Sequence, residues 1–197
     1  MSRVSNDAGD SDITKFLDPT DVVSPPLKKP KIDPDLDSEA KAKVKRKVDV
    51  KVDVGMRILR KGDWDDPEYK RQRDIFEEQF ESSEGYDVDW DKLDFNFPAV
   101  RFEWASGLSA RHTNLELLNL LLETAIEEEN EENGTDIEFV KYVSANVLGV
   151  QGFLFYITFW AKDLSSPDPE PKLYQAKVRK FADEIDVSEF RLRPTQE

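Results

Sequence analysis

The side chains that most often carry out catalysis are scarce in this sequence, and none of them lies in a catalytic spacing. The chain has no cysteine, so thiol nucleophiles, thiolate metal sites and disulfide bonds are excluded. The single histidine, His112, has no nucleophile beside it and precedes a predicted helix cap. Neither a glycine-rich phosphate loop nor a metal-ligand spacing is present. We therefore predict that the protein is not an enzyme and that it binds no cofactor and no metal.

Carboxylates are plentiful, and their densest group is the acidic run at residues 127–132. A series of glutamates at the end of a helix does not form the opposed pair that general acid–base catalysis needs. The run has two remaining interpretations, a binding patch and a solvated helix end. We favour the solvated end, because such charge runs usually face water.

The stretch with the clearest binding chemistry is ANVLGVQGFLFYITFWAKD, residues 145–163. Two glycines, Gly149 and Gly152, stand three positions apart and predict a tight turn between two strands. The aromatic run after them alternates apolar side chains on both faces, which predicts a strand covered on both sides. The turn therefore either joins two core strands and does nothing more, or presents its tip to a partner.

The elements around this turn predict an α+β fold. A capping box at Thr113 and Glu116 starts a long helix, and Gly134 ends it. Strands are predicted over residues 136–147, 153–163 and 172–181, with Val143 among the inward residues of the first strand. The long helix covers one face of this sheet, and segments nearer the N-terminus must cover the other face.

We divide the chain into a tail (residues 1–46), an N-terminal extension (residues 47–112) and a main domain (residues 113–193). Alternating valines from residue 48 to residue 54 predict a half-buried strand at the start of the extension. Asp66 as N-cap, Pro67 at the first position and Gly85 near the end predict an extra N-terminal helix. An aromatic strap follows, and we expect it to pack through four residues. These are Tyr86, Trp90, Phe95 and Phe97.

The composition of residues 1–46 predicts disorder, because prolines and charged residues offer too little apolar surface for a core. The tail contains two basic clusters spaced like a two-part nuclear import signal. The clusters are Lys28, Lys29 and Lys31, and then Lys43, Lys45, Arg46 and Lys47. The alternative interpretation is a solvated tail that repels itself.

The net charge of −14 is carried by residues 55–197, which contain 17 basic and 31 acidic side chains. An acidic domain repels phosphate backbones, so we expect no nucleic-acid partner. The chain lacks an N-terminal apolar segment typical of a secretion signal, and it has no apolar run long enough to cross a membrane. We expect an intracellular protein, cytoplasmic or nuclear, that does not bind membranes.

Four segments of this chain, in order, resemble the plant cystatins. They are LLETAIEEEN (Leu121–Asn130), IEFVKYVSAN (Ile137–Asn146), FYITFWAKD (Phe155–Asp163) and LYQAKV (Leu173–Val178). The upstream stretch GYDVDWDKLDF is similar to the plant cystatin-related family, a branch of the cystatin/monellin superfamily with N-terminal extensions. The resemblance implies a cystatin-like fold, in which one long helix packs on a twisted antiparallel sheet.

Cystatins inhibit papain-type cysteine proteases by filling the active-site cleft with a wedge. The wedge combines a free N-terminal trunk with a glycine, a first hairpin reading Gln-x-Val-x-Gly and a second hairpin with Pro-Trp. By this resemblance the first hairpin keeps its Val and Gly, places Leu148 at the Gln position and displaces the Gln. Phe181 lies close to the Pro-Trp position. The protease-binding residues that the resemblance implies are Leu148, Gly149, Val150, Gln151, Gly152, Phe181 and Gly107.

The resemblance thus implies a reversible, non-covalent inhibitor of papain-type cysteine proteases. The alternative is a non-inhibitory protein-interaction module, with the basic tail as its nuclear address. The two functions differ in what the extension does. If the extension packs over the turn at residues 148–152 or over Gly107, it blocks a protease from these edges.

Overall fold

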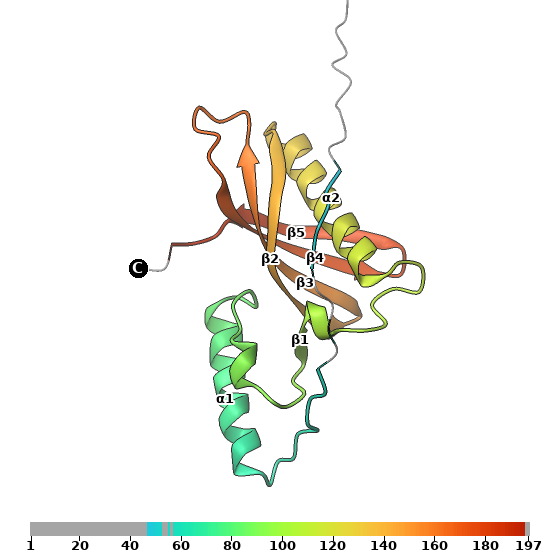
Figure 1. Cartoon of the computed structure of the whole chain (residues 1–197), viewed down its shortest axis with the longest axis vertical. Helices are drawn as coiled ribbons and strands as arrows, with labels where there is room; N and C mark the ends of the chain where they lie inside the picture. The colour runs from blue at the N-terminus through green and yellow to red at the C-terminus, as the bar shows by residue number, and fades with distance from the viewer. Residues whose placement is uncertain (1–46, 53–54, 56, 196–197) are drawn as a thin grey trace, which may run out of the picture. The chain divides into compact units, whose positions relative to one another are not determined.

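The computed structural model describes residues 47–52, 55 and 57–195. In this part of the chain, two α-helices and one five-stranded antiparallel sheet form an α+β fold (Figure 1). The predicted α+β class is therefore confirmed. The predicted disordered tail, residues 1–46, lies outside the described residues, and so do all of its basic clusters except Lys47.

The sheet is a meander whose strands lie side by side in chain order. The strands are β1 (Ala99–Arg101), β2 (Ile137–Val150), β3 (Gly152–Asp163), β4 (Lys172–Phe181) and β5 (Glu184–Leu192). The sequence predicts β2, β3 and β4, but it misses β5. A register shift where β5 pairs with β4 interrupts the alternation that begins with Ile185 and Val187, so the period-two signal is short.

Helix α2 (Asn114–Asn133) covers one face of the sheet, which we call the front face. The predicted capping box is present: the Thr113 hydroxyl accepts from Glu116 N–H, and the Glu116 carboxylate accepts from Thr113 N–H. The apolar stripe of α2 is buried against strand residues such as Phe155 and Phe159, both fully buried. Each such side chain contributes about 1.5–3 kcal/mol through burial.

Helix α1 (Pro67–Ser82) begins as predicted, because Asp66 Oδ1 accepts a hydrogen bond of 2.8 Å from Glu68 N–H. It ends at Ser82, and Gly85 lies in the closing turn, where its N–H donates to Phe80 O at 2.7 Å. Glu84 takes the left-handed position of this turn, with φ 55°. The turn carries the chain directly onto the sheet.

The extension covers part of the opposite face, the back face, through α1 and the loop that contains 3₁₀-helix η1 (Trp90–Lys92). The Tyr156 ring on this face packs edge-on against Phe80 and Tyr86. A second 3₁₀-helix, η2 (Phe102–Trp104), follows β1. The predicted covering of both faces is confirmed around Tyr156, while Trp160 further along β3 stays 38% exposed.

The segment at residues 47–52 is extended but is not a strand of the sheet. Val48 and Val50 are buried in the core, so the alternation read from the sequence does report a buried face. Their N–H groups donate to α2 side chains, Val48 to Glu123 at 3.2 Å and Val50 to Asn119 at 2.9 Å. The prediction of a strand is wrong here, because helix side chains satisfy the backbone instead of a neighbouring strand.

The inward residue in the middle of β2 is Tyr142, not Val143. Two register shifts against β3 lie between Phe139 and Lys141 and between Tyr142 and Ser144. Each extra residue turns the following side chains to the other face. As a result Tyr142 is 8% exposed and Val143 is 40% exposed, which corrects the strict alternation expected from the sequence.

Candidate functional site

The β2–β3 hairpin closes in a tight turn at Gln151, with Val150 paired to Gly152. Gly152 has a left-handed φ of 86°, and a Cβ at this position would clash with the backbone carbonyl of Lys180. Only glycine therefore allows this turn to approach the end of β4 so closely. The two hairpins of the sheet are packed together at this contact.

The β4–β5 hairpin provides the second tip, with Phe181 paired to Glu184 across a turn in which Ala182 has φ 51°. The Phe181 side chain is 42% exposed, and the Arg179 guanidinium lies 5.9 Å from its ring centroid. Arg179 also donates to the Gln151 carbonyl at 3.3 Å, so it links the two tips. We call this end of the sheet, residues 149–152 and 181–184, the hairpin end.

The hairpin end presents apolar surface to solvent. Val150 is 46% exposed, similar to Phe181, and nothing lies within 4 Å of where a Gly149 Cβ would be. The Arg111 guanidinium from the loop before α2 pairs with Asp183 at 2.9 Å. The second turn is thereby fastened to the loop that contains Gly107.

Gly107 does not occupy a free trunk. It lies in the loop between η2 and α2, with a left-handed φ of 69° and open space where a Cβ would point. The trunk position, the chain before β1, is tied into the extension. Asn96 N–H donates to Arg60 O at 2.9 Å, and Arg60 N–H donates to Asp94 O at 2.7 Å.

Leu148 differs from the other residues of the first hairpin because the extension covers it. It pairs with Ala99 of β1 and packs against the aromatic cluster that contains Phe76 and Trp90. Of the seven residues that the resemblance implies, four lie together at the first tip, all exposed except the half-buried Gly152, and Phe181 joins them from the second tip. These four are Gly149, Val150, Gln151 and Gly152. The structure leaves Leu148 half-buried and keeps Gly107 in a different loop.

The resemblance gives no role to the buried polar contacts that two β2 residues make, Asn146 on the back face and Tyr142 on the front face. Asn146 accepts from Trp90 Nε1–H at 2.7 Å and donates to the carbonyls of Gly85 and Tyr86. Tyr142 donates to the buried Glu103 carboxylate at 2.9 Å. Burial, and then the charge of Glu103, raise the pKa of the Tyr142 phenol. A pattern of apolar residues carries no signal for such contacts, because their partners are far apart in sequence.

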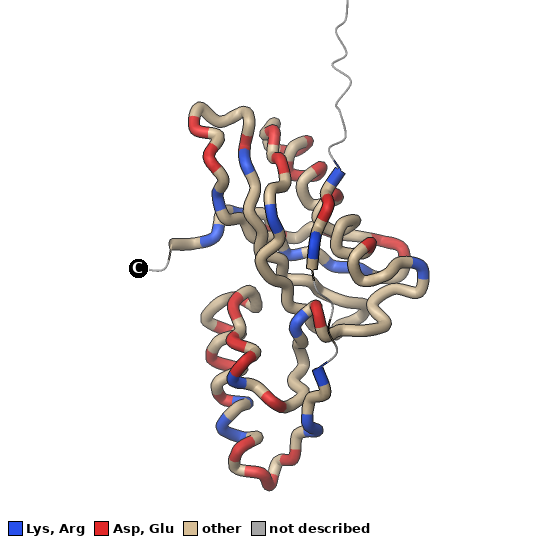
Figure 2. Tube along the Cα trace, in the orientation of Figure 1, with Lys and Arg blue, Asp and Glu red and all other residues tan. Residues whose placement is uncertain are grey.

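The predictions that the protein is not an enzyme and holds no metal stay predictions. In the described part of the chain, no group of three metal-ligating side chains gathers. His112 is exposed, with Nδ1 3.4 Å from the Ser109 hydroxyl. Figure 2 shows acidic residues along both helices, with basic residues among them in α1 but none in α2. Among the described helices, none has the length and apolar character needed to span a bilayer.

Lys47 is the only member of the two basic clusters within the described residues. It is exposed and lines a small cavity of about 280 Å³ beside Ile126 and Ile137. Lys47 thus lies near the C-terminal half of α2. The nuclear import signal stays a prediction. Comparison of the whole sequence with protein-family models and with curated proteins gives no match.

Proposed function

We propose that this chain is a cystatin-like, reversible inhibitor that occludes the active-site cleft of a papain-type cysteine protease with its hairpin end. The observation that carries the proposal is the contact of Gly152 with the Lys180 backbone, which holds two exposed tips side by side. The fold class also supports it, because one long helix packed on an antiparallel sheet is what the resemblance implies.

The physical basis of binding would be the exclusion of water from a few exposed apolar anchors. Val150 and Phe181 are 46% and 42% exposed, and together they offer an aliphatic and an aromatic contact. Gly149 lets the backbone approach a partner surface because no side chain stands in the way. In interfaces of this kind, a few buried anchors supply most of the binding free energy.

The extension should weaken this inhibitor relative to a complete wedge. Leu148 faces the aromatic cluster instead of a cleft, and the chain before β1 is fastened by Arg60. Loss of one strong anchor removes about 2 kcal/mol or more, which is about 30-fold in affinity. We therefore expect papain to be bound at least about 30-fold more weakly than by a complete wedge.

A second candidate function is a non-inhibitory interaction module. It is favoured by the same covering of Leu148, because the aromatic cluster occupies space that a protease would need beside the first tip. In this case the hairpin end binds another protein, and the basic clusters direct the chain to the nucleus. This function needs no access to a deep cleft.

The test is a titration of papain activity with the full chain and with three single variants. Val150→Asp and Phe181→Asp should each raise the inhibition constant at least about 30-fold, because a charge replaces an anchor. Val143→Asp is the matched control, since Val143 is similarly exposed on β2 but away from the hairpin end. It should inhibit like the unaltered chain.

Two results would decide against protease inhibition. One is the absence of inhibition by the full chain at about 100 μM, and the other is an equal loss of inhibition in all three variants. A complementary variant, Leu148→Gln, restores the side chain that the resemblance expects. If the extension limits the wedge, this replacement leaves inhibition unchanged, because residue 148 does not reach the partner.

A further inference from the structure

The extension meets the back face of the sheet through a segment of distinct composition. Residues 81–91, from the end of α1 into η1, contain five acidic and no basic side chains, and they include Tyr86 and Trp90. Tyr86 is buried and packs edge-on against the Tyr156 ring of β3. Trp90 is also buried, and its Nε1–H donates to Asn146 of β2 at 2.7 Å. The back face therefore already binds one segment that is both acidic and aromatic.

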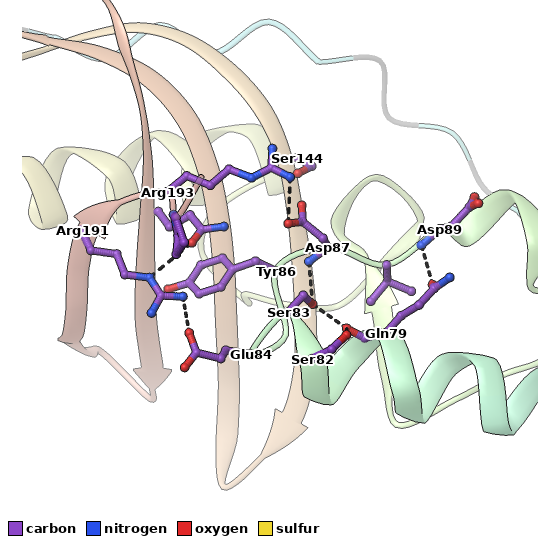
Figure 3. Close-up of a pocket in the computed structure, with 13 residues that line it drawn as sticks. Gln79, Ser82, Ser83, Glu84, Tyr86, Asp87, Asp89, Ser144, Arg191 and Arg193 are labelled. Atoms are coloured by element: carbon purple, nitrogen blue, oxygen red, sulfur yellow. Dashed lines mark hydrogen bonds and ion pairs between the residues drawn. The ribbon is translucent and has the colours of Figure 1, made fainter. Parts of the chain in front are cut away.

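Ion pairs join the charge of this segment to the sheet. Figure 3 shows Arg191 of β5 directed toward Glu84, with which it forms an ion pair. Arg193, just after β5, pairs with Asp87 at 2.9 Å. The turn after α1 and the sheet enclose a polar cavity of about 600 Å³ at this junction. The two arginines of the covered part of the back face are thus used to hold carboxylates of the extension.

The back face continues beyond the extension as an uncovered patch. Trp160 lies four residues beyond Tyr156 on β3, so both side chains point to this face. Lys141 of β2 and Leu173 of β4 are the direct cross-strand partners of Trp160, and such partners share a face. Lys162, two residues further on β3, points the same way. We call Lys141, Trp160, Lys162 and Leu173 the lysine–tryptophan patch.

The patch has the same kinds of side chain as the covered part, but without a covering segment. Trp160 is 38% exposed, whereas Tyr156 is 5% exposed beneath the extension. Lys141 is exposed and Lys162 is half-buried, and neither forms an ion pair with another described residue. Because Lys162 stands opposite Glu138 in the sheet, we assign the main charge contact of the patch to Lys141.

The acidic character of the chain does not exclude an acidic ligand at this patch. Charges in solution are screened over about 8 Å at physiological ionic strength, so the side chains nearest to a bound segment determine its electrostatic energy. The extension is itself an example, because its acidic segment is held by arginines of the same acidic domain.

We propose that the lysine–tryptophan patch is a docking surface for an acidic peptide segment of a partner protein. The segment has the chemistry of residues 81–91, with carboxylates on both sides of an aromatic side chain. The aromatic side chain packs against Trp160 and Leu173, and a carboxylate pairs with Lys141. The surface continues the interface that the extension already forms. It is independent of the hairpin end, because Trp160 lies near the opposite end of β3 from Gly152.

The experiment is a fluorescence-anisotropy titration of a labelled peptide, ESSEGYDVDWD, with the full chain. This peptide has the sequence of residues 81–91. The extension should keep its own place on the sheet, because a tethered segment has an effective concentration of about 1 mM. We expect the free peptide to bind the vacant patch with a Kd of about 100 μM.

Two altered peptides test the proposed chemistry. One has Gln and Asn in place of Glu and Asp, and the other has Ala in place of Tyr and Trp. Each should bind at least about fivefold more weakly, because one loses the charge contact and the other loses the aromatic contact.

Variants of the full chain locate the binding surface. Trp160→Ala should weaken binding about tenfold or more, and Lys141→Glu should weaken it about fivefold. Lys70→Glu reverses an exposed lysine on α1, so it is the matched control and should bind like the unaltered chain. Val150→Asp should also bind normally, which separates this docking surface from the hairpin end. All four variants should keep their melting temperature within about 3 °C, because the side chains replaced are exposed.

Four results would overturn the proposal. The first two are the absence of saturable binding at about 1 mM peptide, and binding that both Trp160→Ala and Lys141→Glu leave unchanged. The third is tighter binding of an oligothymidine of about ten nucleotides, which would make the patch a nucleic-acid site. The fourth is self-association of the chain that Trp160→Ala abolishes in sedimentation velocity, which would make the occupant a second copy.

Discussion

The two faces of the sheet are buried in different ways. On the front face, β3 places Phe155, Ile157 and Phe159 against α2, and all three are fully buried. On the back face, the buried positions include Asn146, Thr158 and Gln175, and the covering is a helix end and loops. One face is therefore a mainly apolar core, and the other combines aromatic contacts with polar contacts.

This difference teaches that the same strand can serve two separate purposes. Front-face burial is non-directional, and its stabilisation grows with the apolar area removed from water. Back-face packing depends on individual donors and acceptors, so it fixes where the extension sits and leaves a cavity. We expect the largest losses of stability from front-face substitutions, and we expect the back face to determine where the extension sits.

The largest effect is expected from the front face. Phe159→Ala removes a fully buried ring and should lower the free energy of unfolding by about 3–5 kcal/mol. Trp160→Ala, the next residue but on the back face and 38% exposed, should cost less than about 1 kcal/mol. Urea unfolding followed by circular dichroism measures both. Equal losses would contradict the distinction between the faces.

The next effect concerns the hydrogen bonds that join β2 to the extension. Asn146→Ala leaves the Trp90 indole N–H and two backbone carbonyls without their partner, so we expect a loss of about 2–4 kcal/mol. Asn119→Ala is the control, because it removes one bond, from Val50 N–H, and should cost about 1 kcal/mol. Hydrogen exchange should show faster exchange in α1 only for Asn146→Ala. Faster exchange in α1 in both variants would contradict a specific role for Asn146.

Substitution of two glycines, Gly85 and Gly134, tests a single contact on the back face, the one between Gly85 and Tyr156. Gly85 has φ 92°, and a Cβ there would lie 2.6 Å from the Tyr156 ring. Gly134 has φ 66° and open space around it. Both alanine variants pay about 1 kcal/mol for the left-handed backbone, and Gly85→Ala should cost about 1–3 kcal/mol more through displacement of the ring. Equal melting temperatures would show that the Tyr156 contact is loose.

The smallest effect on the free energy of unfolding is expected at alkaline pH. Burial and nearby carboxylates raise the pKa of Tyr86 and Tyr142 above the ordinary value near 10. The folded state holds these protons more tightly than the unfolded state, so their contribution is complete below about pH 10 and is lost as pH rises towards the folded pKa.

Above about pH 10 each of these two tyrosines should reduce the free energy of unfolding by about 1.4 kcal/mol per pH unit. Tyr86 faces Glu189, Glu84 and Arg191. Tyr142 faces Glu103 and Arg101. Tyr86→Phe and Tyr142→Phe should each make the decline less steep, and the urea midpoint between pH 9 and pH 11 measures it. A slope that neither variant changes would show that both phenols ionise as in the unfolded chain.

Only part of the candidate site could be predicted from the sequence. The turn at Gly149 and Gly152 follows from glycine spacing between two apolar strands, and the structure has it there. The extension's contact with Leu148 could not be predicted, because it depends on Phe76 and Trp90, which reach it only after folding. Gly107 follows β1 and does not lie in a trunk before it. This placement could not be predicted until the position of the short strand β1 was known.

The sequence by itself determined the elements whose signal is local. The capping box at Thr113 and the alternation of β3 specify a helix and a strand within a few residues, and the α+β class follows from their order. Tertiary structure decided where backbone and polar groups find partners. Asn146 bonds to Gly85 across 61 residues, and the segment with Val48 and Val50 bonds to α2 instead of a strand. Periodicity reports which side of an element is buried, but the chemistry of the covering surface is set by residues that are distant in the chain.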